Sequence, residues 1–212
     1  SICRQIANST NAQLVLHLDH GASYEQVIQC LRNGFTSVMI DGSRLPLEEN
    51  IRVTKEVIRA AHTVGVSVEA ELGAIGGTED GMTAKANLVN VDDARCFLEE
   101  VTVEALAIGI GNAHGIYKST PNLAFDRLEQ VAALGGPALV LHGGSGIPDD
   151  MIRKAIVMGI RKINVATEVR LAFLEGFGLE VNSKDIYKAY QSAQAHARKI
   201  ISDKMSLFDT TK

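Results

Sequence analysis

The alternation of short apolar segments with longer amphipathic segments limits the possible folds of this chain more than any other feature. Apolar segments of strand length recur along the sequence, and the segments between them repeat apolar residues at helical spacing. The predicted strands are residues 13–19, 37–41, 66–72, 105–111, 138–142 and 162–166. Strands that are apolar on both faces and are separated by helices predict a parallel sheet with covered faces.

Helices are predicted in the segments between these strands. The segment 23–33 opens with Ser23, a residue type that caps helix N-termini, and Gly34 follows where glycine often ends a helix. The other predicted helices are residues 46–62, 91–100, 124–133 and 148–158. Residues 1–8 are typical of the end of a helix, and the tail at about 184–207 is predicted to form one more helix or two.

These elements predict a single α/β domain over residues 1–212, and a (β/α)8 TIM barrel fits them best. The polar residues capable of chemistry follow the carboxyl ends of the strands, where such barrels place their sites. The sequence supplies six predicted strands and not the full set, so we expect that the first two strand–helix units of the barrel are absent from it. An open doubly wound sheet is the competing fold.

The composition restricts the possible partners and location. A net charge of −4 gives no general attraction to nucleic acid or to an anionic membrane. No apolar run approaches the roughly 20 residues of a membrane span, and the first residues lack the apolar region of a signal peptide. Cys3, Cys30 and Cys96 have no metal-like spacing, which favours reduced cysteines. We expect a cytoplasmic protein with a small-molecule substrate, no nucleic-acid partner and no membrane association.

Histidines recur just past the predicted strands, each beside a glycine. These are His20, His114 and His142. A lone histidine in such a place is more often structural, but neutral imidazoles that meet at one barrel mouth suit zinc with an open position for substrate. His17 is expected to lie deeper, as a supporting residue.

Carboxylates accompany these histidines. Asp19 precedes His20, is expected to face the opposite side of the pleat, and is a candidate general base. In the strand 66–72 the alternation points Glu69 and Glu71 to one face, where the alternative to a metal role is a buried salt bridge to a lysine or arginine. Asp41 ends another strand, and its alternative role is that of a turn or capping residue.

Glycine-rich loops supply further candidates. Residues 142–148 form a loop of backbone N–H groups that runs into a helix N-terminus, which is a natural anion cradle. Residues 164–168 end the last predicted strand and begin a helix, so the two loops together occupy the usual phosphate corner of a barrel. The loop 75–82 is either a flexible connector or a segment that closes over substrate and carries Glu79.

With these motifs in order, the sequence resembles the zinc-dependent class II ketose-bisphosphate aldolases, the group that holds fructose-bisphosphate and tagatose-bisphosphate aldolases. The motifs that carry the resemblance are residues 17–21, 68–73, 76–81, 111–117, 142–146 and 164–168. They cover most of residues 12–173. Their order and residues resemble the tagatose-type and Gram-positive fructose-type branch more than the longer enterobacterial fructose enzymes.

The resemblance implies roles for individual residues. His20, His114 and His142 would bind Zn²⁺, and Asp41 and Glu71 match positions of a second or displaced metal site. Asp19 would exchange the proton of the ketose C4 hydroxyl, Glu79 would handle the proton at the dihydroxyacetone-phosphate carbon, and Asn164 would orient the substrate. The residues implied in holding the substrate and its phosphate are Gly115, Gly143, Gly144, Ser145, Asn164, Val165, Ala166 and Thr167. A monovalent cation, Na⁺ or K⁺, near the phosphate is a further family feature.

The activity implied is reversible cleavage of a phosphorylated ketose, of the fructose-1,6-bisphosphate or tagatose-1,6-bisphosphate type, to dihydroxyacetone phosphate and an aldehyde. Zinc stabilises the enediolate in this reaction as a Lewis acid. A homodimer or homotetramer is expected. The alternatives are a non-catalytic barrel subunit of an aldolase complex and a metal-dependent hydrolase on the same fold.

Overall fold

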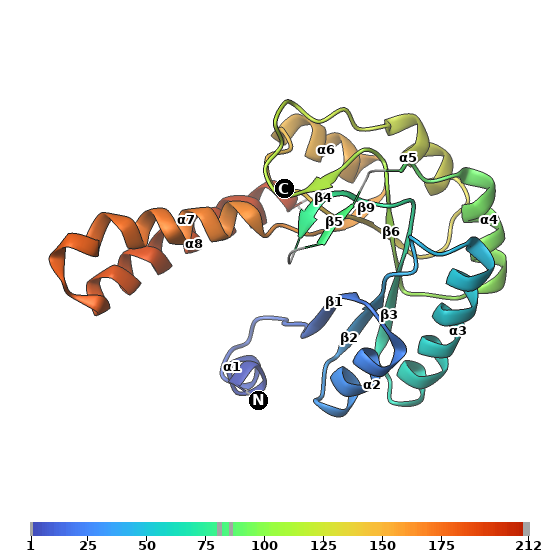
Figure 1. The fold of residues 1–212 in the computed structure, drawn as a ribbon, viewed down its shortest axis with the longest axis horizontal. Helices are drawn as coiled ribbons and strands as arrows, with labels where there is room; N and C mark the ends of the chain where they lie inside the picture. The colour runs from blue at the N-terminus through green and yellow to red at the C-terminus, as the bar shows by residue number, and fades with distance from the viewer. Residues whose placement is uncertain (1, 80–81, 85–86, 210–212) are drawn as a thin grey trace.

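A curled parallel sheet forms the centre of the molecule (Figure 1). The computed structural model describes residues 2–79, 82–84 and 87–209. Within these ranges the main sheet has the strand order β1-β2-β3-β6-β8-β9, which is also the order in the sequence. The strands are β1 (His17–Gly21), β2 (Ser37–Ile40), β3 (Ser67–Leu72), β6 (Ala105–Ile108), β8 (Ala138–Leu141) and β9 (Ile160–Ile163). Each neighbouring pair is parallel, as the sequence predicted.

The predicted helices between the strands are confirmed, and they lie along the outer side of the sheet (Figure 1). They are α2 (Tyr24–Arg32), α3 (Leu47–Thr63), α4 (Val91–Glu100), α5 (Phe125–Ala132) and α6 (Asp149–Val157). The Ser23 side chain caps α2 by accepting a hydrogen bond from the Gln26 N–H. Gly34 follows with a φ of 78°, the left-handed conformation that ends many helices.

Several predicted strand boundaries are wrong; the strand expected to end at residue 111, for example, ends at Ile108. Residues 162–166 were expected to form the last strand, but β9 begins at Ile160, and the register with β8 shifts so that Lys162 pairs with Val140. The shift keeps both Ile160 and Ile163 on the apolar core. At the other end of the sheet, Leu14 and Val15 are exposed and precede β1, because pairing with β2 begins only at His17.

The two faces of the sheet differ in chemistry. The outer face packs against the helices and holds the main core, to which β3 contributes Val68, Ala70 and Leu72. The inner face has a small apolar cluster of Met39, Ala107 and Val140. The remaining inner positions near the carboxyl ends of the strands carry polar side chains, and this is where the candidate site lies.

A second, smaller sheet stands at the carboxyl ends of the main strands. It consists of β4 (Gly76–Glu79), β5 (Met82–Ala84) and β7 (Ala113–His114), in the order β5-β4-β7. Gly77 pairs with His114, and a side chain at position 77 would clash with the His114 carbonyl oxygen, so this close pairing requires glycine. The sequence did not predict this sheet, which fixes the backbone beside His114.

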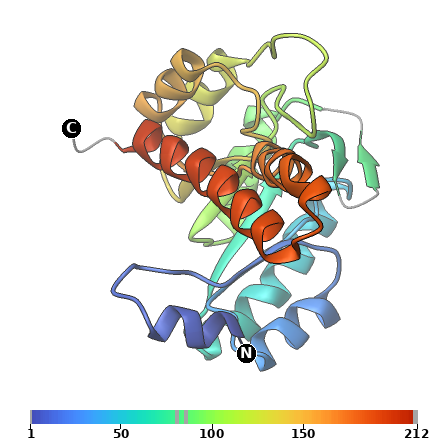
Figure 2. The same cartoon turned by 90° about the vertical axis from the view of Figure 1, so that its left-hand side faces the viewer.

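The remaining helices lie apart from the strand–helix repeat. They are α1 (Ile2–Asn8), α7 (Thr167–Glu180), the 3-10 turn η1 (Val181–Ser183) and α8 (Ile186–Phe208). α7 and α8 lie side by side and project from the rest of the molecule, as Figures 1 and 2 show from two directions. The end of α8 returns to the main core through Leu207. Among the described residues, no helix is both long enough and apolar enough to cross a lipid bilayer.

Candidate metal centre and active site

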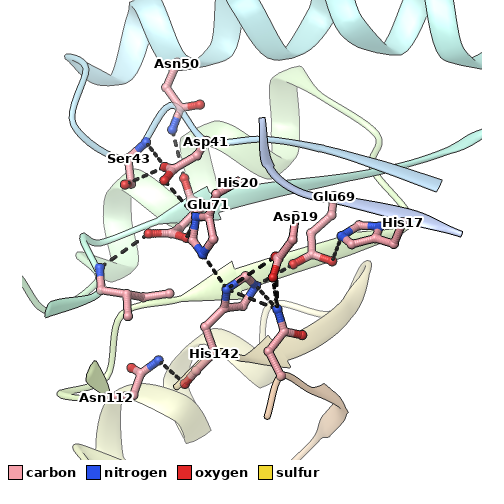
Figure 3. A network of polar contacts seen from close by, with 12 residues as sticks. His17, Asp19, His20, Asp41, Ser43, Asn50, Glu69, Glu71, Asn112 and His142 are labelled. Atoms are coloured by element: carbon pink, nitrogen blue, oxygen red, sulfur yellow. Dashed lines mark hydrogen bonds and ion pairs between the residues drawn. The ribbon is translucent and has the colours of Figure 1, made fainter. Parts of the chain in front are cut away.

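The structure brings together the three histidines that the sequence singled out. His20 lies in β1, His114 in β7, and His142 directly after β8, and each offers a ring nitrogen within 4.8 Å of the others. His142 is fully buried, and its Nδ1 lies 2.9 Å from Nε2 of His20 (Figure 3). Residues far apart in the sequence thus place imidazole nitrogens around one point.

The backbone at His20 corrects one expectation. Asp19 and His20 were expected to face opposite sides of the pleat, but both side chains line the same cavity. His20 has a φ of 47°, a left-handed conformation that is uncommon for a residue with a side chain, and the register of β1 against β2 shifts between Leu18 and Gly21. The irregularity turns His20 inward beside Asp19, and simple alternation cannot predict it.

A carboxylate holds the second ring nitrogen of two of these histidines. Nδ1 of His20 lies 3.0 Å from Oδ2 of Asp41, and Nε2 of His142 lies 2.7 Å from Oε1 of Glu69. Such contacts fix the tautomer and the orientation of metal-binding histidines. They leave His20 Nε2 and His142 Nδ1 turned toward the centre of the cluster.

The chemistry of the donor set fits a divalent cation such as zinc. His20, Asp41 and Glu71 form a second group whose ligand atoms lie within 4.8 Å of one another. Oε2 of Glu71 is buried without a hydrogen-bond partner and lies 3.8 Å from His20 Nδ1. Such a buried oxygen is costly unless a cation or a proton meets it. Imidazole and carboxylate ligands of this kind are those that zinc prefers.

The charges within the site shift several pKa values. Burial opposes the charge on His20, but its hydrogen bond with Asp41 and the charge of Glu71 outweigh burial and raise the His20 pKa to about 9. Burial also opposes the charge on Asp41, yet its contacts with His20 and Ser43 lower its pKa to about 2. Burial, followed by the charge of Asp41, raises the pKa of Glu71 to about 8. The site therefore binds protons that a metal ion would displace.

Asp41 makes the turn contact that was predicted as its alternative role, and it also contacts His20. Its Oδ1 accepts hydrogen bonds from the Ser43 N–H and hydroxyl at 3.0 and 2.7 Å, which is a turn contact, and its Oδ2 holds His20. The Asn50 side chain supports this region from α3 by donating to the Glu71 carbonyl oxygen at 2.9 Å. Sequence reasoning missed Asn50, which is buried in α3. The only sequence signal would have been a polar residue on the apolar face of an amphipathic helix.

Asp19 lies at the edge of the histidine cluster and is held by an amide. Its Oδ1 lies 4.0 Å from Nδ1 of His142. The Asn164 amide nitrogen donates to Oδ1 and Oδ2 of Asp19 at 3.1 and 3.2 Å. The structure thus joins two residues predicted as catalytic. The side chain of Glu79, the third, lies outside the described part of the chain, and its backbone ends β4.

A buried network that sequence reasoning only partly found lies below Asp19. Glu69 is 1% exposed, and its Oε2 lies 3.0 Å from Nζ of Lys162 and 3.6 Å from Nε2 of His17. His17 Nδ1 lies 2.8 Å from the Ser37 hydroxyl, so His17 occupies a supporting position, as expected. The buried salt bridge considered for the carboxylates of β3 is present at Glu69, and sequence reasoning did not single out Lys162 as its partner.

The predicted phosphate loops line a cavity of about 420 Å³ beside Asp19 and His114. The residues from these loops are Gly115, Gly143, Ser145, Asn164, Val165, Ala166 and Thr167. Gly144 does not line it: its N–H donates to the Asn164 carbonyl at 2.8 Å, and a side chain there would lie 2.7 Å from Ile163 Cγ2. The Gly146 N–H donates to the carboxylate of Glu168, which is paired in turn with Lys204.

A second cavity, of about 550 Å³, opens on the other side of Asp19 and His114. Its lining includes His20, Asp41 and Glu71, together with Arg44 and Arg170. Asp19, His114, Ala166 and Arg170 line both cavities. The candidate site therefore has two lobes that meet at the predicted base and the histidine cluster, and each lobe has a cationic side chain in its wall.

Comparison with known proteins gives a consistent answer. The family model described as fructose-bisphosphate aldolase class-II matches residues 1–212. A fructose-bisphosphate aldolase of Streptococcus pyogenes serotype M3 is 45% identical over 201 residues, which are 94% of this chain and 64% of that protein. A 6-phospho-5-dehydro-2-deoxy-D-gluconate aldolase of Halalkalibacterium halodurans is 46% identical over 82% of this chain and 61% of its own length. The chain thus spans less than two thirds of these relatives.

Solved structures of aldolases share the fold. The YdjI aldolase from Escherichia coli K12 superposes with a TM-score of 0.86 at 31% identity, covering 97% of this chain and 73% of that one. A putative fructose-1,6-bisphosphate aldolase from Coccidioides immitis gives a TM-score of 0.91 at 26% identity, covering 99% and 76%. These neighbours confirm the predicted (β/α)8 barrel class over an open doubly wound sheet. The chain belongs to the class II fructose-bisphosphate aldolase family.

Proposed function

We propose that this protein is a zinc-dependent aldolase that reversibly cleaves a phosphorylated ketose to dihydroxyacetone phosphate and an aldehyde. One observation carries the proposal: the cluster of His20, His114 and His142 lies beside Asp19, at the junction of two cavities. Zinc dependence is the norm in this family, and the histidine cluster suits that metal.

The substrate phosphate would bind in the lobe formed by the loops after β8 and β9. The N-terminus of α7 favours an anion there, and Gly143, Ser145 and Thr167 line the lobe. Anchoring the phosphate fixes the position of the ketose carbons relative to Asp19 and the histidines. A monovalent cation, Na⁺ or K⁺, is proposed to accompany the phosphate.

Asp19 would accept the proton of the ketose hydroxyl and return it in the synthetic direction. The hydrogen bonds from Asn164 favour the ionised carboxylate, which is the form that a base requires. Zinc, when held by His20, His114 and His142, would supply Lewis acidity to the substrate carbonyl. Asp41 and Glu71 would serve as a second or displaced metal position beside His20. Glu79 would exchange the proton at the dihydroxyacetone-phosphate carbon.

The second lobe would take the aldehyde half of the substrate. The names of the relatives include a fructose bisphosphate and a phosphorylated dehydro-deoxygluconate, so anionic groups at the far end of the substrate differ within the family. Arg44 and Arg170 in this lobe favour an anionic aldehyde half, as in fructose-1,6-bisphosphate or tagatose-1,6-bisphosphate. We further propose a cytoplasmic homodimer or homotetramer with one barrel domain per chain.

The non-catalytic alternative is disfavoured because a purely structural subunit has no need of Asp19 hydrogen-bonded beside a histidine cluster. The test is a panel of ketose 1-phosphates and 1,6-bisphosphates given to the zinc-loaded protein. Dihydroxyacetone phosphate, the common product, is measured by a coupled reduction. We expect cleavage of at least one bisphosphate. A zinc-loaded protein that releases this product from no member of the panel would overturn the proposal.

A further inference from the structure

We propose that Lys162 is the positioning residue of this site, whose ammonium group orients the Asn164 amide toward Asp19 and pairs with Glu69 behind His142. The inference rests on the proposed function and extends it to a residue that lines the proposed phosphate lobe and whose polar contacts are with Asn164 and Glu69. Lys162 lies in β9, and its Nζ lies 2.7 Å from Oδ1 of Asn164 and 3.0 Å from Oε2 of Glu69.

The ammonium group decides which end of the Asn164 amide faces Asp19. A lysine ammonium has donors and no acceptor, so the amide atom next to it must be the oxygen. The NH₂ group is then turned toward both carboxylate oxygens of Asp19. A reversed amide would place its oxygen against a carboxylate and its NH₂ against an ammonium, and both contacts repel. Lys162 therefore selects the orientation in which Asn164 supports the base.

The same ammonium group stabilises a buried carboxylate. Glu69 is almost completely buried, and a charge in such a place is costly unless it is paired. Its other oxygen accepts from Nε2 of His142 at 2.7 Å, and this contact leaves Nδ1 of His142 facing His20. Lys162 thus supports the base through Asn164 and the histidine cluster through Glu69.

The local backbone explains how Lys162 reaches both partners. The register shift between β8 and β9 pairs Leu139 with Ile160 and Val140 with Lys162. Since Ile160 and Ile163 both join the outer core, the shift turns Lys162 to the inner face together with Asn164 two residues later. Figure 3 shows Asp19, Glu69 and His142 gathered on this inner face.

The experiment compares Lys162→Met, Asn164→Ala and the double variant in the zinc-loaded protein. We expect Lys162→Met to lower kcat about 100-fold with a smaller rise in KM, of less than about tenfold, because Lys162 lines the phosphate lobe but its hydrogen bond and ion pair are with Asn164 and Glu69. Since Lys162 acts through Asn164, the double variant should have a kcat within about threefold of Asn164→Ala alone. Lys162→Arg keeps the charge and the donors, so its kcat should be at least about tenfold higher than that of Lys162→Met. Fully additive losses, or a raised KM with unchanged kcat, would overturn the proposal.

A readout that does not depend on turnover tests the Glu69 arm. Zinc affinity, measured by competition with a chromophoric chelator, should fall about tenfold in Lys162→Met because the orientation of His142 is loosened. Lys199→Met is the matched control: it removes a lysine that lies 2.7 Å from Asp203 on exposed α8 and should change neither kcat nor zinc affinity. Zinc affinity equal to that of the wild type in Lys162→Met contradicts the inference.

If Lys162→Met fails to fold, Lys162→Gln takes its place, since it retains a donor without the charge, and a wild-type kcat in that variant overturns the proposal. If the wild-type protein cleaves no ketose phosphate, the proposed function fails, while the zinc affinities of Lys162→Met and wild type still decide the role of Lys162.

Discussion

The outer and inner faces of the sheet follow opposite rules, although they are built from alternate residues of the same strands. In β3, Val68 and Ala70 pack into the apolar core, while the adjacent Glu69 and Glu71 are equally buried among histidines. The outer face gains stability from area removed from water. The inner face holds buried polar groups: Glu69 is paired with Lys162, whereas burial raises the pKa of Glu71, whose Oε2 has no hydrogen-bond partner. We therefore propose that the outer face serves folding and the inner face serves chemistry, and we expect mutations to affect the two separately.

The largest expected effect is on the inner face. Asp19→Ala should lower kcat by roughly 10³-fold, since a general base contributes on that scale. Asp19 lies 4.0 Å from Nδ1 of His142, so zinc content and thermal unfolding should stay near those of the wild type. Steady-state kinetics with metal analysis checks this, and near-normal turnover would remove Asp19 from the mechanism.

An outer-face change should do the reverse. Leu106 in β6 is fully buried in the main core, next to Ala107 on the inner face. Leu106→Ala should lower the free energy of unfolding by about 3 kcal/mol through lost burial and a cavity. Zinc stoichiometry and kcat, measured well below the unfolding transition, should be unchanged. A loss of zinc binding in the folded variant would show that the two faces are not independent.

The carboxylate behind His142 offers a matched pair of variants. Glu69→Gln should weaken zinc binding by about 10- to 100-fold, as expected for the hydrogen-bond partner of a metal ligand. The control is Glu104→Gln, which alters a histidine–carboxylate pair on the exposed side, where Glu104 lies 3.2 Å from His62. Its zinc affinity should equal that of the wild type. Equal zinc affinities in Glu69→Gln and Glu104→Gln would show that Glu69 does not orient His142 for zinc.

The last predicted effect is a pH dependence that needs no substitution. In the metal-free protein the pKa of His20 is raised to about 9, so His20 is protonated at neutral pH. Zinc must displace that proton, and its affinity should therefore rise with pH toward about 9, by at most roughly tenfold per pH unit, and then level off. Zinc titrations from pH 7 to pH 9.5 measure this slope. An affinity that falls over this range contradicts a protonated His20.

Much of this arrangement could be predicted from the sequence. Periodicity indicated the helices and the parallel strands because each element follows its own local rule. The histidines were identifiable because each follows a strand predicted from the sequence, and parallel strands end at one edge. Two wrong predictions were the direction of the His20 side chain and the bounds of the last strand. Both depend on departures from regular strand pairing, namely the left-handed backbone at His20 and the register shift before Lys162. A strand pattern carries no signal of which residue will be skipped.

The central claim is that the polar inner face holds zinc for aldol cleavage, and metal removal tests it most directly. The protein is treated with chelator, freed of it, and titrated with zinc while cleavage of fructose-1,6-bisphosphate or tagatose-1,6-bisphosphate is followed. We expect no cleavage without metal and a linear recovery that ends at one zinc per chain, since both candidate groups share His20. Full cleavage by exhaustively demetallated protein would contradict the account.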